Sequence, residues 1–418
     1  MTPEHCTVLI IGAGPAGLAA ALELQRLGVG GILVVEREGE AGGTPRFCHH
    51  TGFGWHDLRR MYSGPDYARA YRKRVAAAGI EVRTSTMVTG WCAPHTVAVS
   101  GPAGVQQIEA DAILLATGCR ERPATARLVP GDRPAGVFTT GSLQRFVYEY
   151  GQQVGRRAVV VGAELVSLSA VLTLAHSHSA VTAMVTEHPR HQIYFPFTPV
   201  MWYAQRRLGV HLMPHTRVSR IDGHRRVEAI ECTHVDTGQT ETVPCDTVIF
   251  TGAWIPEHEL ARSGGLRLDD GTRGPQVDGA LRTTTPGVFA AGNLLHGAQT
   301  ADYAALEGRR AAQSVARFLA ATTWPQQGVA VKAVAPVAWV TPNRVVPTEL
   351  PGKSEFVFQS DRFCRNVYAS FYQGDRCLFT QRVGQLVPNR SYYLPDHWLA
   401  AVDREAGCLE FRLAEDGW

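Results

Sequence analysis

The stretch of sequence that decides the fold is VLIIGAGPAG, residues 8–17. Its first four residues are all apolar, which predicts a strand buried on both faces. Gly12, Gly14 and Gly17 follow at the spacing G-x-G-x-x-G. In a dinucleotide-binding turn the first glycine makes the tight turn, the second lets a pyrophosphate approach the backbone, and the third allows helix and strand to pack closely. The stretch therefore predicts a dinucleotide site where the strand ends.

The residues after this turn complete the predicted unit. Residues 18–27 favour a helix, whose amino end offers free N–H groups and a favourable dipole to phosphate. A second apolar strand, 32–35, ends at Glu36, where a carboxylate is placed to accept hydrogen bonds from an adenosine ribose. The alternative is a glycine-rich turn without a ligand, and the strand–turn–helix–strand context argues against it. We also expect Arg37 and Val88 to line the cofactor.

Length and composition limit the remaining possibilities. The chain has 418 residues, enough for two or three domains, and 45% hydrophobic and 19% charged residues are typical of a globular protein. A formal net charge of +3 gives no sign of a nucleic-acid partner. The first strand begins too early to leave room for a signal peptide, and no apolar run is long enough for a transmembrane segment. These features predict a cytoplasmic protein and leave peripheral membrane association open.

Cysteine and histidine patterns argue against metal or dithiol chemistry. Nine cysteines are scattered along the chain, and none lies in a C-x-x-C pair. A close-spaced redox disulfide and a cysteine-rich metal cluster are therefore unexpected, and the odd count favours reduced thiols. Histidines occur at short spacings, for example at His211 and His215, and we interpret them as solvated or core side chains. We predict no metal site.

A second strand–turn–helix follows the first, and its turn departs from the glycine pattern. After Gly162, the second glycine is replaced by Glu164 and the third by Ser167, while Glu187 follows the next strand. A carboxylate where a pyrophosphate should approach costs both space and charge. Gly162, Glu164 and Glu187 are the candidate residues for a second ligand, an adenine nucleotide or NAD(P). The substitution predicts that NAD(P)H binds weakly or not at all.

Later segments return the chain to the first domain and then begin a third. Residues 112–118 predict a buried strand ending in Thr-Gly, and residues 285–293 predict one ending in Gly-Asn, followed by an amphipathic helix. Beyond Pro325 the pattern has period two and many turns. The predicted fold class is α/β: two tandem Rossmann-like dinucleotide-binding domains, the second inserted in the first, plus a small β-rich C-terminal domain. The expected limits are 1–122 with 272–325, then 123–271, then 329–418.

Three motifs in order, GAGPAG, LLATGC and PGVFAAGN, carry a resemblance. With them the chain resembles the two-dinucleotide-fold flavoproteins that include thioredoxin and glutathione reductases. More narrowly, GGTPRFCHHTGFG, ATGCRERP and AAGNLLHGAQTADYAALEG resemble the FAD/NAD(P)-fold, alpha-type subunits of heteromeric amine and amino-acid dehydrogenases. That group includes the hydroxyproline and proline dehydrogenases, the opine oxidases and hydrogen cyanide synthase.

The resemblance implies FAD as the cofactor and assigns residues to it. The implied residues are Gly12, Gly14 and Gly17 at the pyrophosphate, Glu36 at the ribose, Thr117, Gly118 and Gly292 beside the FAD, Asn293 at the ribityl chain, and Thr300 at the helix end facing the flavin pyrimidine. Related reductases usually have an aspartate where Asn293 stands, and asparagine can make the same hydrogen bond without charge. Thr44, Cys48 and His49 lie in a glycine- and proline-broken loop and could line a flavin pocket; a plain surface loop is the alternative.

The leading interpretation is an FAD-dependent oxidoreductase. It would be a subunit of a multi-subunit amine or amino-acid dehydrogenase of the hydroxyproline, proline or opine type, passing electrons between the flavin and partner cofactors. The resemblance implies a second flavin subunit of the amine-oxidase type and a small iron–sulfur (2Fe–2S) protein as partners. Two alternatives stay open: a stand-alone NAD(P)H-dependent flavin reductase of a protein or quinone acceptor, and a non-catalytic nucleotide-binding scaffold subunit.

Overall fold

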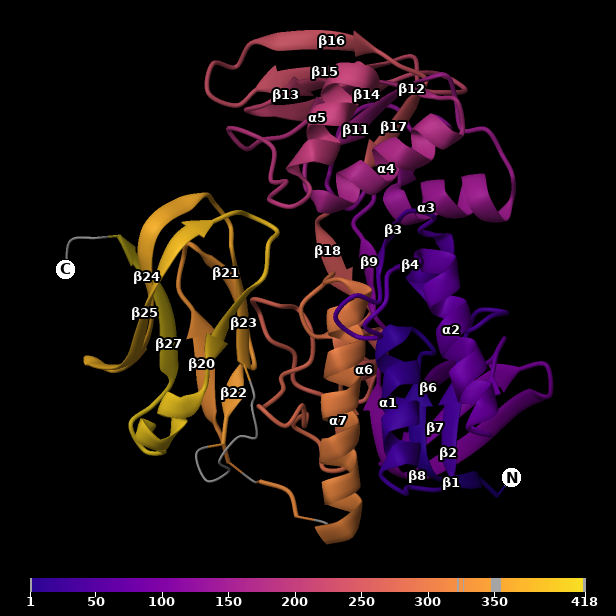
Figure 1. Cartoon of the computed structure of the whole chain (residues 1–418), viewed down its shortest axis with the longest axis vertical. Coiled ribbons are helices and arrows are strands. Elements are labelled where there is room, and N and C mark those ends of the chain that lie inside the picture. The colour runs from indigo at the N-terminus through magenta and orange to yellow at the C-terminus, as the bar shows by residue number, and fades with distance from the viewer. Residues whose placement is uncertain (1, 322, 326, 347–354, 416–418) are drawn as a thin grey trace. The chain divides into compact units, whose positions relative to one another are not determined.

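The computed structural model describes residues 2–321, 323–325, 327–346 and 355–415 (Figure 1). The chain forms two compact units. Met1–Arg46, Thr51–Cys119 and Pro256–Trp418 make up the first, and Phe47–His50 with Arg120–Ile255 make up the second. The predicted fold class is confirmed, because a second Rossmann-like sheet is inserted in the first and a β-rich region follows. The compact units change at residues 119/120 and 255/256, whereas the predicted domain limits are 122 and 271, and these domain limits stay a prediction.

The first unit is built on a seven-stranded sheet in the order β5-β2-β1-β8-β7-β6, with β19 paired on β8. The central strand β1 (Glu4–Ile11) runs parallel to β2 (Ile32–Val35) and to β8 (Gly104–Leu115). Val8 and Leu9 of β1 are fully buried, as a strand covered on both faces requires. The other strands are β5 (Glu81–Arg83), β6 (Met87–Ala93), β7 (Thr96–Gly101) and β19 (Val288–Ala290).

Two helices of the first unit, α1 (Pro15–Arg26) and α7 (Ala301–Ala321), lie side by side (Figure 1). Gly308 makes this close packing possible, because a Cβ at Gly308 would lie only 2.0 Å from the carbonyl oxygen of Ala16. None of the helices within the described residues has the length and apolar character that crossing a bilayer requires. The smaller elements are η1 (Thr44–Phe47), β3 (Thr51–Phe53), β4 (Tyr62–Ser63), α2 (Gly64–Ala77), α6 (Glu259–Ser263) and η3 (Gly292–Leu294).

The second unit has its own parallel sheet, in the order β10-β17-β11-β12-β13. Its strands are β10 (Val137–Thr139), β11 (Arg157–Val161), β12 (Ala180–Val185), β13 (His211–Met213) and β17 (Thr247–Phe250). A three-stranded antiparallel sheet is inserted between β13 and β17 and consists of β14 (Thr216–Asp222), β15 (Ala229–His234) and β16 (Thr240–Pro244). The helices are α3 (Thr140–Gln144), η2 (Arg145–Glu149), α4 (Leu165–His176) and α5 (Thr198–Arg207). Strands β9 (Cys119–Glu121) and β18 (Trp254–Pro256) pair where the chain enters and leaves this unit.

The C-terminal region belongs to the first unit and consists of two small sheets, β22-β20-β27-β24-β25 and β21-β23-β26. Aromatic side chains fill its core: the ring centroids of Phe371 and Trp398 are 4.4 Å apart, and those of Phe371 and Phe411 are 4.6 Å apart. The elements are β20 (Val329–Ala333), β21 (Val337–Thr341), β22 (Arg344–Val345), β23 (Glu355–Ser360), β24 (Cys364–Gln373), β25 (Arg376–Leu386), β26 (Tyr392–Pro395), η4 (His397–Ala401) and β27 (Leu409–Glu415).

Candidate functional site

The first glycine loop joins β1 to α1 and leaves an open space beside its second glycine. Gly12 has φ of 108°, and a Cβ there would lie 2.4 Å from the Ala116 carbonyl oxygen, so the position requires glycine. A Cβ on Gly14, in contrast, would meet only the Cα of Gly43, at 4.0 Å. Gly14 is the N-cap of α1, whose first-turn N–H groups face this opening. The loop therefore has the room and the hydrogen-bond donors that a pyrophosphate needs.

Glu36 holds this loop in shape. The side chain is buried, its Oε2 accepts a hydrogen bond from Ala13 N at 2.8 Å, and its Oε1 accepts one from Glu38 N at 2.9 Å. Each carboxylate oxygen keeps further acceptor capacity, so ribose hydroxyls could still donate to Glu36. Val88 lies two residues beyond Thr86, whose N–H donates to the backbone oxygen of Glu36 at 2.8 Å. The structure therefore brings the segment that leads to Val88 next to Glu36.

Arg37, Thr117 and Gly118 meet at one residue that the sequence did not single out, Glu257. A guanidinium nitrogen of Arg37 lies 3.5 Å from the Glu257 carboxylate. The Thr117 hydroxyl donates to Glu257 O at 2.9 Å, and Glu257 N donates to Gly118 O at 2.9 Å. The hydroxyl of Thr117 is thus engaged by the protein, while its predicted place beside the cofactor stays a prediction.

Asn293 closes the loop that leads into α7. Its Oδ1 accepts from Gln299 N at 3.1 Å, and its Nδ2 donates to Gln299 O at 3.4 Å. Gly292 has φ of 75°, and its N–H donates to Glu307 Oε2 at 2.9 Å. The carbonyl of Thr300 accepts from Ala304 N at 3.1 Å, so the helical pattern starts at Thr300. The roles of Gly292, Asn293 and Thr300 toward a ribityl chain and a flavin stay predictions.

Cys48 and His49 belong to the second compact unit, whereas Thr44 begins η1 in the first. The Cys48 thiol donates to Gln144 Oε1 at 3.4 Å, and burial raises the pKa of Cys48 to about 12. The ring of His49 stacks on Tyr148 with centroids 3.9 Å apart, and burial lowers the pKa of His49. A thiol with this pKa is a poor nucleophile at neutral pH. A flavin-pocket role for Thr44, Cys48 and His49 stays a prediction.

The second glycine loop has a carboxylate in the space that is open at Gly14. Glu164 is the N-cap of α4 and is only 7% exposed. Its Oε2 lies 2.8 Å from where a Cβ on Gly162 would stand, and its Oε1 lies 2.8 Å from where a Cβ on Gly252 would stand. Within the described residues, Oε1 of Glu164 has no hydrogen-bond partner. The side chain therefore covers the ends of both β11 and β17.

Residues around Glu164 close this loop further. The hydroxyls of Ser167 and Thr251 lie 2.8 Å apart, at the position where the first loop has its third glycine. Arg127 Nη2 donates to Thr251 O at 2.7 Å and to Gly252 O at 2.9 Å, so this cation is bound to carbonyl groups. Glu187 is exposed. The position that corresponds to Glu36 holds Thr186, because the residue just before each accepts from the first glycine of its loop: Gly12 N donates to Val35 O, and Gly162 N donates to Val185 O.

A family model described as pyridine nucleotide-disulphide oxidoreductase matches residues 6–308. This chain belongs to the pyridine nucleotide-disulphide oxidoreductase family. Family membership confirms the predicted class of enzyme, an FAD-dependent oxidoreductase, and the family binds FAD and often NAD(P). The narrower resemblance to amine dehydrogenase subunits is not decided by this match.

Individual relatives differ in how much of their length this family member covers. An opine oxidase subunit of Agrobacterium tumefaciens (strain Ach5) is 28% identical over 338 residues, which are 73% of this chain and 64% of that protein. The ferredoxin–NADP reductase of Ignicoccus hospitalis is 27% identical over 327 residues, 76% of this chain and 99% of that protein. The solved thioredoxin reductase of T. acidophilum gives a TM-score of 0.64 at 20% identity, covering 76% of this chain and 100% of that one. This chain thus spans just under two thirds of the opine oxidase protein, and the thioredoxin reductase likeness shows the fold alone.

Sequence reasoning missed two acids of α7 that organise the site of this family member. Asp302 is buried and accepts hydrogen bonds from Gly54 N at 2.6 Å and His56 N at 2.7 Å, which ties a distant loop to the helix end. Glu307 binds Gly292 N and lies 3.4 Å from His296 Nε2. An acid in the first turn of a helix is a recognisable signal, which Asp302 provides. Nothing in the local pattern marks Glu307.

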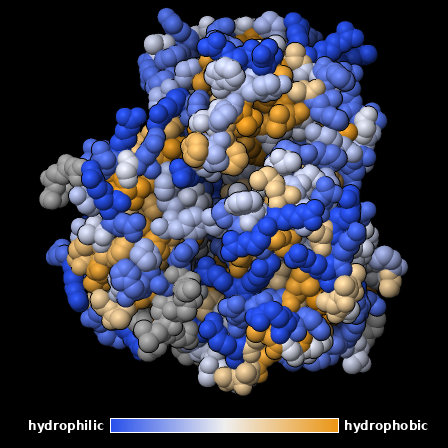
Figure 2. Space-filling view, in the orientation of Figure 1, coloured by the Kyte–Doolittle hydropathy of each residue, from blue (hydrophilic) through white to orange (hydrophobic). Residues whose placement is uncertain are grey.

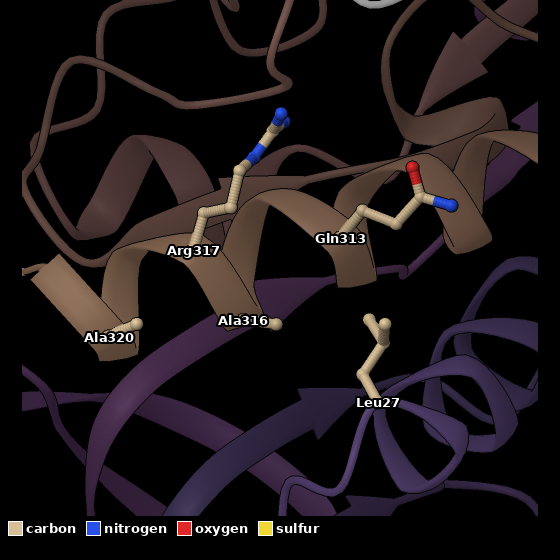
Figure 3. A pocket seen from close by; sticks show the side chains of 5 residues that line it. All are labelled: Leu27, Gln313, Ala316, Arg317 and Ala320. Carbon is tan, nitrogen blue, oxygen red and sulfur yellow. The ribbon is translucent and has the colours of Figure 1, made fainter.

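An open pocket lies elsewhere in the first unit, at the carboxyl end of α1 (Figure 3). Its polar groups are engaged: Gln313 Nε2 donates to Glu23 Oε1 at 3.1 Å, and Arg317 Nη2 donates to Ser314 Oγ at 3.1 Å. Helix α1 has 12 residues, which at a rise of 1.5 Å per residue separates this pocket from the glycine loop by roughly 18 Å. The pocket is not part of the candidate site. Its lining residues are Leu27, Gln313, Ala316, Arg317 and Ala320.

Proposed function

We propose that this family member is the FAD-carrying subunit of a multi-subunit amine or amino-acid dehydrogenase, of the hydroxyproline, proline or opine type. One observation carries the proposal: the two glycine loops of the chain differ in what fills the space above them. At Gly14 this space is open, whereas at Glu164 it holds the chain's own carboxylate. The first loop therefore accommodates a dinucleotide pyrophosphate, and the second obstructs one.

The residues of the first loop fit FAD, which supplies two-electron redox chemistry when it is bound. Gly14 would lie against the pyrophosphate, and the Glu36 carboxylate would accept hydrogen bonds from the ribose. The first-turn N–H groups after Thr300 would stabilise negative charge at the flavin pyrimidine. We propose that Arg37, Val88, Thr117, Gly118, Gly292 and Asn293 line the rest of the cofactor.

Since Glu164 obstructs a nicotinamide dinucleotide, electrons would reach the first domain from another subunit. We propose a second flavin subunit of the amine-oxidase type that oxidises the amine, accompanied by a small 2Fe–2S protein. The similarity to the opine oxidase protein supports an assembly of several subunits, because that relative is named as one subunit of an oxidase. The amine itself would be chosen by the partner subunit.

A stand-alone NAD(P)H-dependent reductase of a protein or quinone acceptor is the second candidate function. One observation favours it: the similarity to ferredoxin–NADP reductase extends over 99% of that protein. The buried Glu164 weighs against it, and so does Thr186, which stands where the first loop has Glu36, since the second loop offers neither an open backbone nor a carboxylate for a ribose.

Purification of the native assembly tests the proposal. We expect a yellow complex that contains FAD and at least one further chain, and whose flavin is reduced by a secondary amine or amino acid under anaerobic conditions. Full amine-dependent reduction of an artificial dye by this chain alone would contradict the partner. Rapid bleaching of the flavin by micromolar NADH or NADPH would favour the stand-alone reductase, and a colourless preparation would favour a scaffold.

A further inference from the structure

The exposed side of α5 in the second unit combines aromatic and basic side chains. Met201 and Ala204 of this helix are buried, with 1% and 2% exposure. On the opposite side Trp202 is 59% exposed and Tyr203 is 47% exposed. Large exposed aromatic side chains that gather on one element mark interaction surfaces in most proteins. In the view of Figure 2, pale and orange residues lie beside hydrophilic ones over the part of the molecule that Figure 1 labels α5.

Helical spacing places two arginines against these aromatics. Arg206 follows Trp202 by four residues and Arg207 follows Tyr203 by four, so each pair lies on neighbouring turns of the same face. Both arginines are exposed. The face therefore presents two aromatic side chains and two cations together.

The turn before α5 adds a third exposed aromatic. Phe197 N donates to Tyr194 O at 2.8 Å, and the rings of these two residues pack edge to face with centroids 6.0 Å apart. Phe195 stands at the tip of this turn, with 81% of its surface exposed. A phenylalanine held outward by the packing of its neighbours resembles the apolar anchors that enter a membrane interface.

The segment of chain that contains this face has charged residues of one sign only. Residues 188–221 contain no aspartate or glutamate but five arginines and four histidines. A basic segment with tryptophan and tyrosine at headgroup depth complements an anionic bilayer surface. The exposed positions of α5 hold no leucine, isoleucine or valine, the residues that would favour a dry protein–protein interface core.

We propose that Phe195, Trp202, Tyr203, Arg206 and Arg207, here called the α5 face, dock the protein on an anionic lipid bilayer surface. The aromatic rings would enter the headgroup region, and the guanidinium groups would lie beside lipid phosphates. This inference is independent of the proposed function, because no residue of the first glycine loop takes part in it.

Co-sedimentation of the 418-residue chain, with its flavin bound, with vesicles tests the proposal. We expect binding to vesicles of phosphatidylglycerol and phosphatidylcholine in equal parts, and little binding to phosphatidylcholine alone. High salt should weaken the binding, since it screens exposed charges. Changing Arg206→Gln and Arg207→Gln together should lower the partition coefficient roughly thirtyfold, at about fivefold for each arginine near an anionic surface.

Two further variants make the test specific to the α5 face. Trp202→Ser with Tyr203→Ser should lose most vesicle binding while keeping the flavin content of the parent protein. Trp55→Ser, at a tryptophan with the same 59% exposure in the other unit, should bind vesicles as the parent does. Failure of the parent protein to bind anionic vesicles overturns the proposal, as does unchanged binding by the double aromatic variant. If instead that variant loses a co-purifying subunit without any vesicle binding by the parent, the face is a protein interface and the proposal is wrong.

Discussion

Replacing Glu164 with glycine gives the second loop the open backbone of the first. The backbone needs no adjustment: Gly14 has φ of −80° and ψ of −172°, and Glu164 has φ of −94° and ψ of −177°. Glycine is also an acceptable N-cap, and the Glu164 side chain makes no capping hydrogen bond that would be lost. We therefore expect Glu164→Gly to fold as the parent does and to differ mainly at the nucleotide position.

The size of the effect follows from where the carboxylate lies. Its Oε2 lies 2.8 Å from the point where a Cβ on Gly162 would stand, and its Oε1 lies 2.8 Å from the corresponding point on Gly252, so the charge lies against the backbone of the loop that a pyrophosphate would approach. Two unit charges about 4 Å apart repel by roughly 4 kcal/mol at an effective dielectric constant near 20. This energy corresponds to about a thousandfold in the dissociation constant. We expect the parent to be reduced by NADH or NADPH slowly or not at all, and Glu164→Gly to bind either nucleotide up to about a thousandfold more tightly.

Anaerobic stopped-flow, with the flavin absorbance followed against nucleotide concentration, measures this directly, and equilibrium titration gives the affinity without requiring electron transfer. Glu164→Gln separates charge from volume, since it keeps the size of the side chain and removes its charge. Glu241→Gln, at an exposed acid of the same unit on β16, is the matched control and should change little. Rapid bleaching of the parent at micromolar nucleotide refutes the reasoning, and so does a Glu164→Gly protein whose affinity equals that of the parent.

Four further predictions follow from single contacts. Gly14→Val should fold but retain little FAD, because its Cβ meets nothing nearer than 4.0 Å in the protein and would fill the pyrophosphate space; near-stoichiometric flavin in the purified variant would contradict this. Gly308→Ala should lower both the melting temperature and the flavin content, because the added Cβ would stand 2.0 Å from the Ala16 carbonyl oxygen. A melting temperature equal to that of the parent would argue against the packing of α1 on α7 described above. Cys48→Ser should leave turnover within about tenfold, since burial raises the pKa of this thiol to about 12 and a hydroxyl can also donate to Gln144; loss of nearly all activity with FAD retained would count against it. Burial raises the pKa of Glu121 from 4.5 to about 7, so the folded state binds this proton more tightly than the unfolded state does. The free energy of unfolding should therefore fall by about 3 kcal/mol as the pH rises from the lower to the higher of these values. Glu121→Gln should flatten this pH dependence in denaturation curves, and an unchanged pH dependence would show that another group is responsible.

The sequence predicted the strand–turn–helix–strand of the first loop correctly, because the pattern that encodes it is local. Gly12, Gly14 and Gly17 and the acid after the next strand lie within one strand–turn–helix–strand, and steric rules fix what each position can do. The β-rich C-terminal region was also predicted correctly, since alternation of apolar and polar residues is a property of single strands. The hydrogen bond between Cys48 and Gln144 could not be predicted, because these residues are 96 positions apart and neither local sequence pattern indicates that the two segments come into contact.

The two buried acids, Glu36 and Glu164, differ in a way that the local sequence pattern does not predict, because the difference depends on their neighbours in the fold. Both are carboxylates near a glycine turn, and both are shielded from solvent. Glu36 has backbone N–H donors for both oxygens and so supports its own loop, leaving the space at Gly14 open. Glu164 has an oxygen without a donor among the described residues and lies across the corresponding space. The residue type is the same in both loops, but only Glu36 has N–H donors for both of its oxygens. We propose that this supply of donors decides whether the carboxylate supports a nucleotide site or obstructs one. For this reason we expect the Glu164 variants, rather than changes at Gly162, to test whether a nicotinamide nucleotide can reduce the protein.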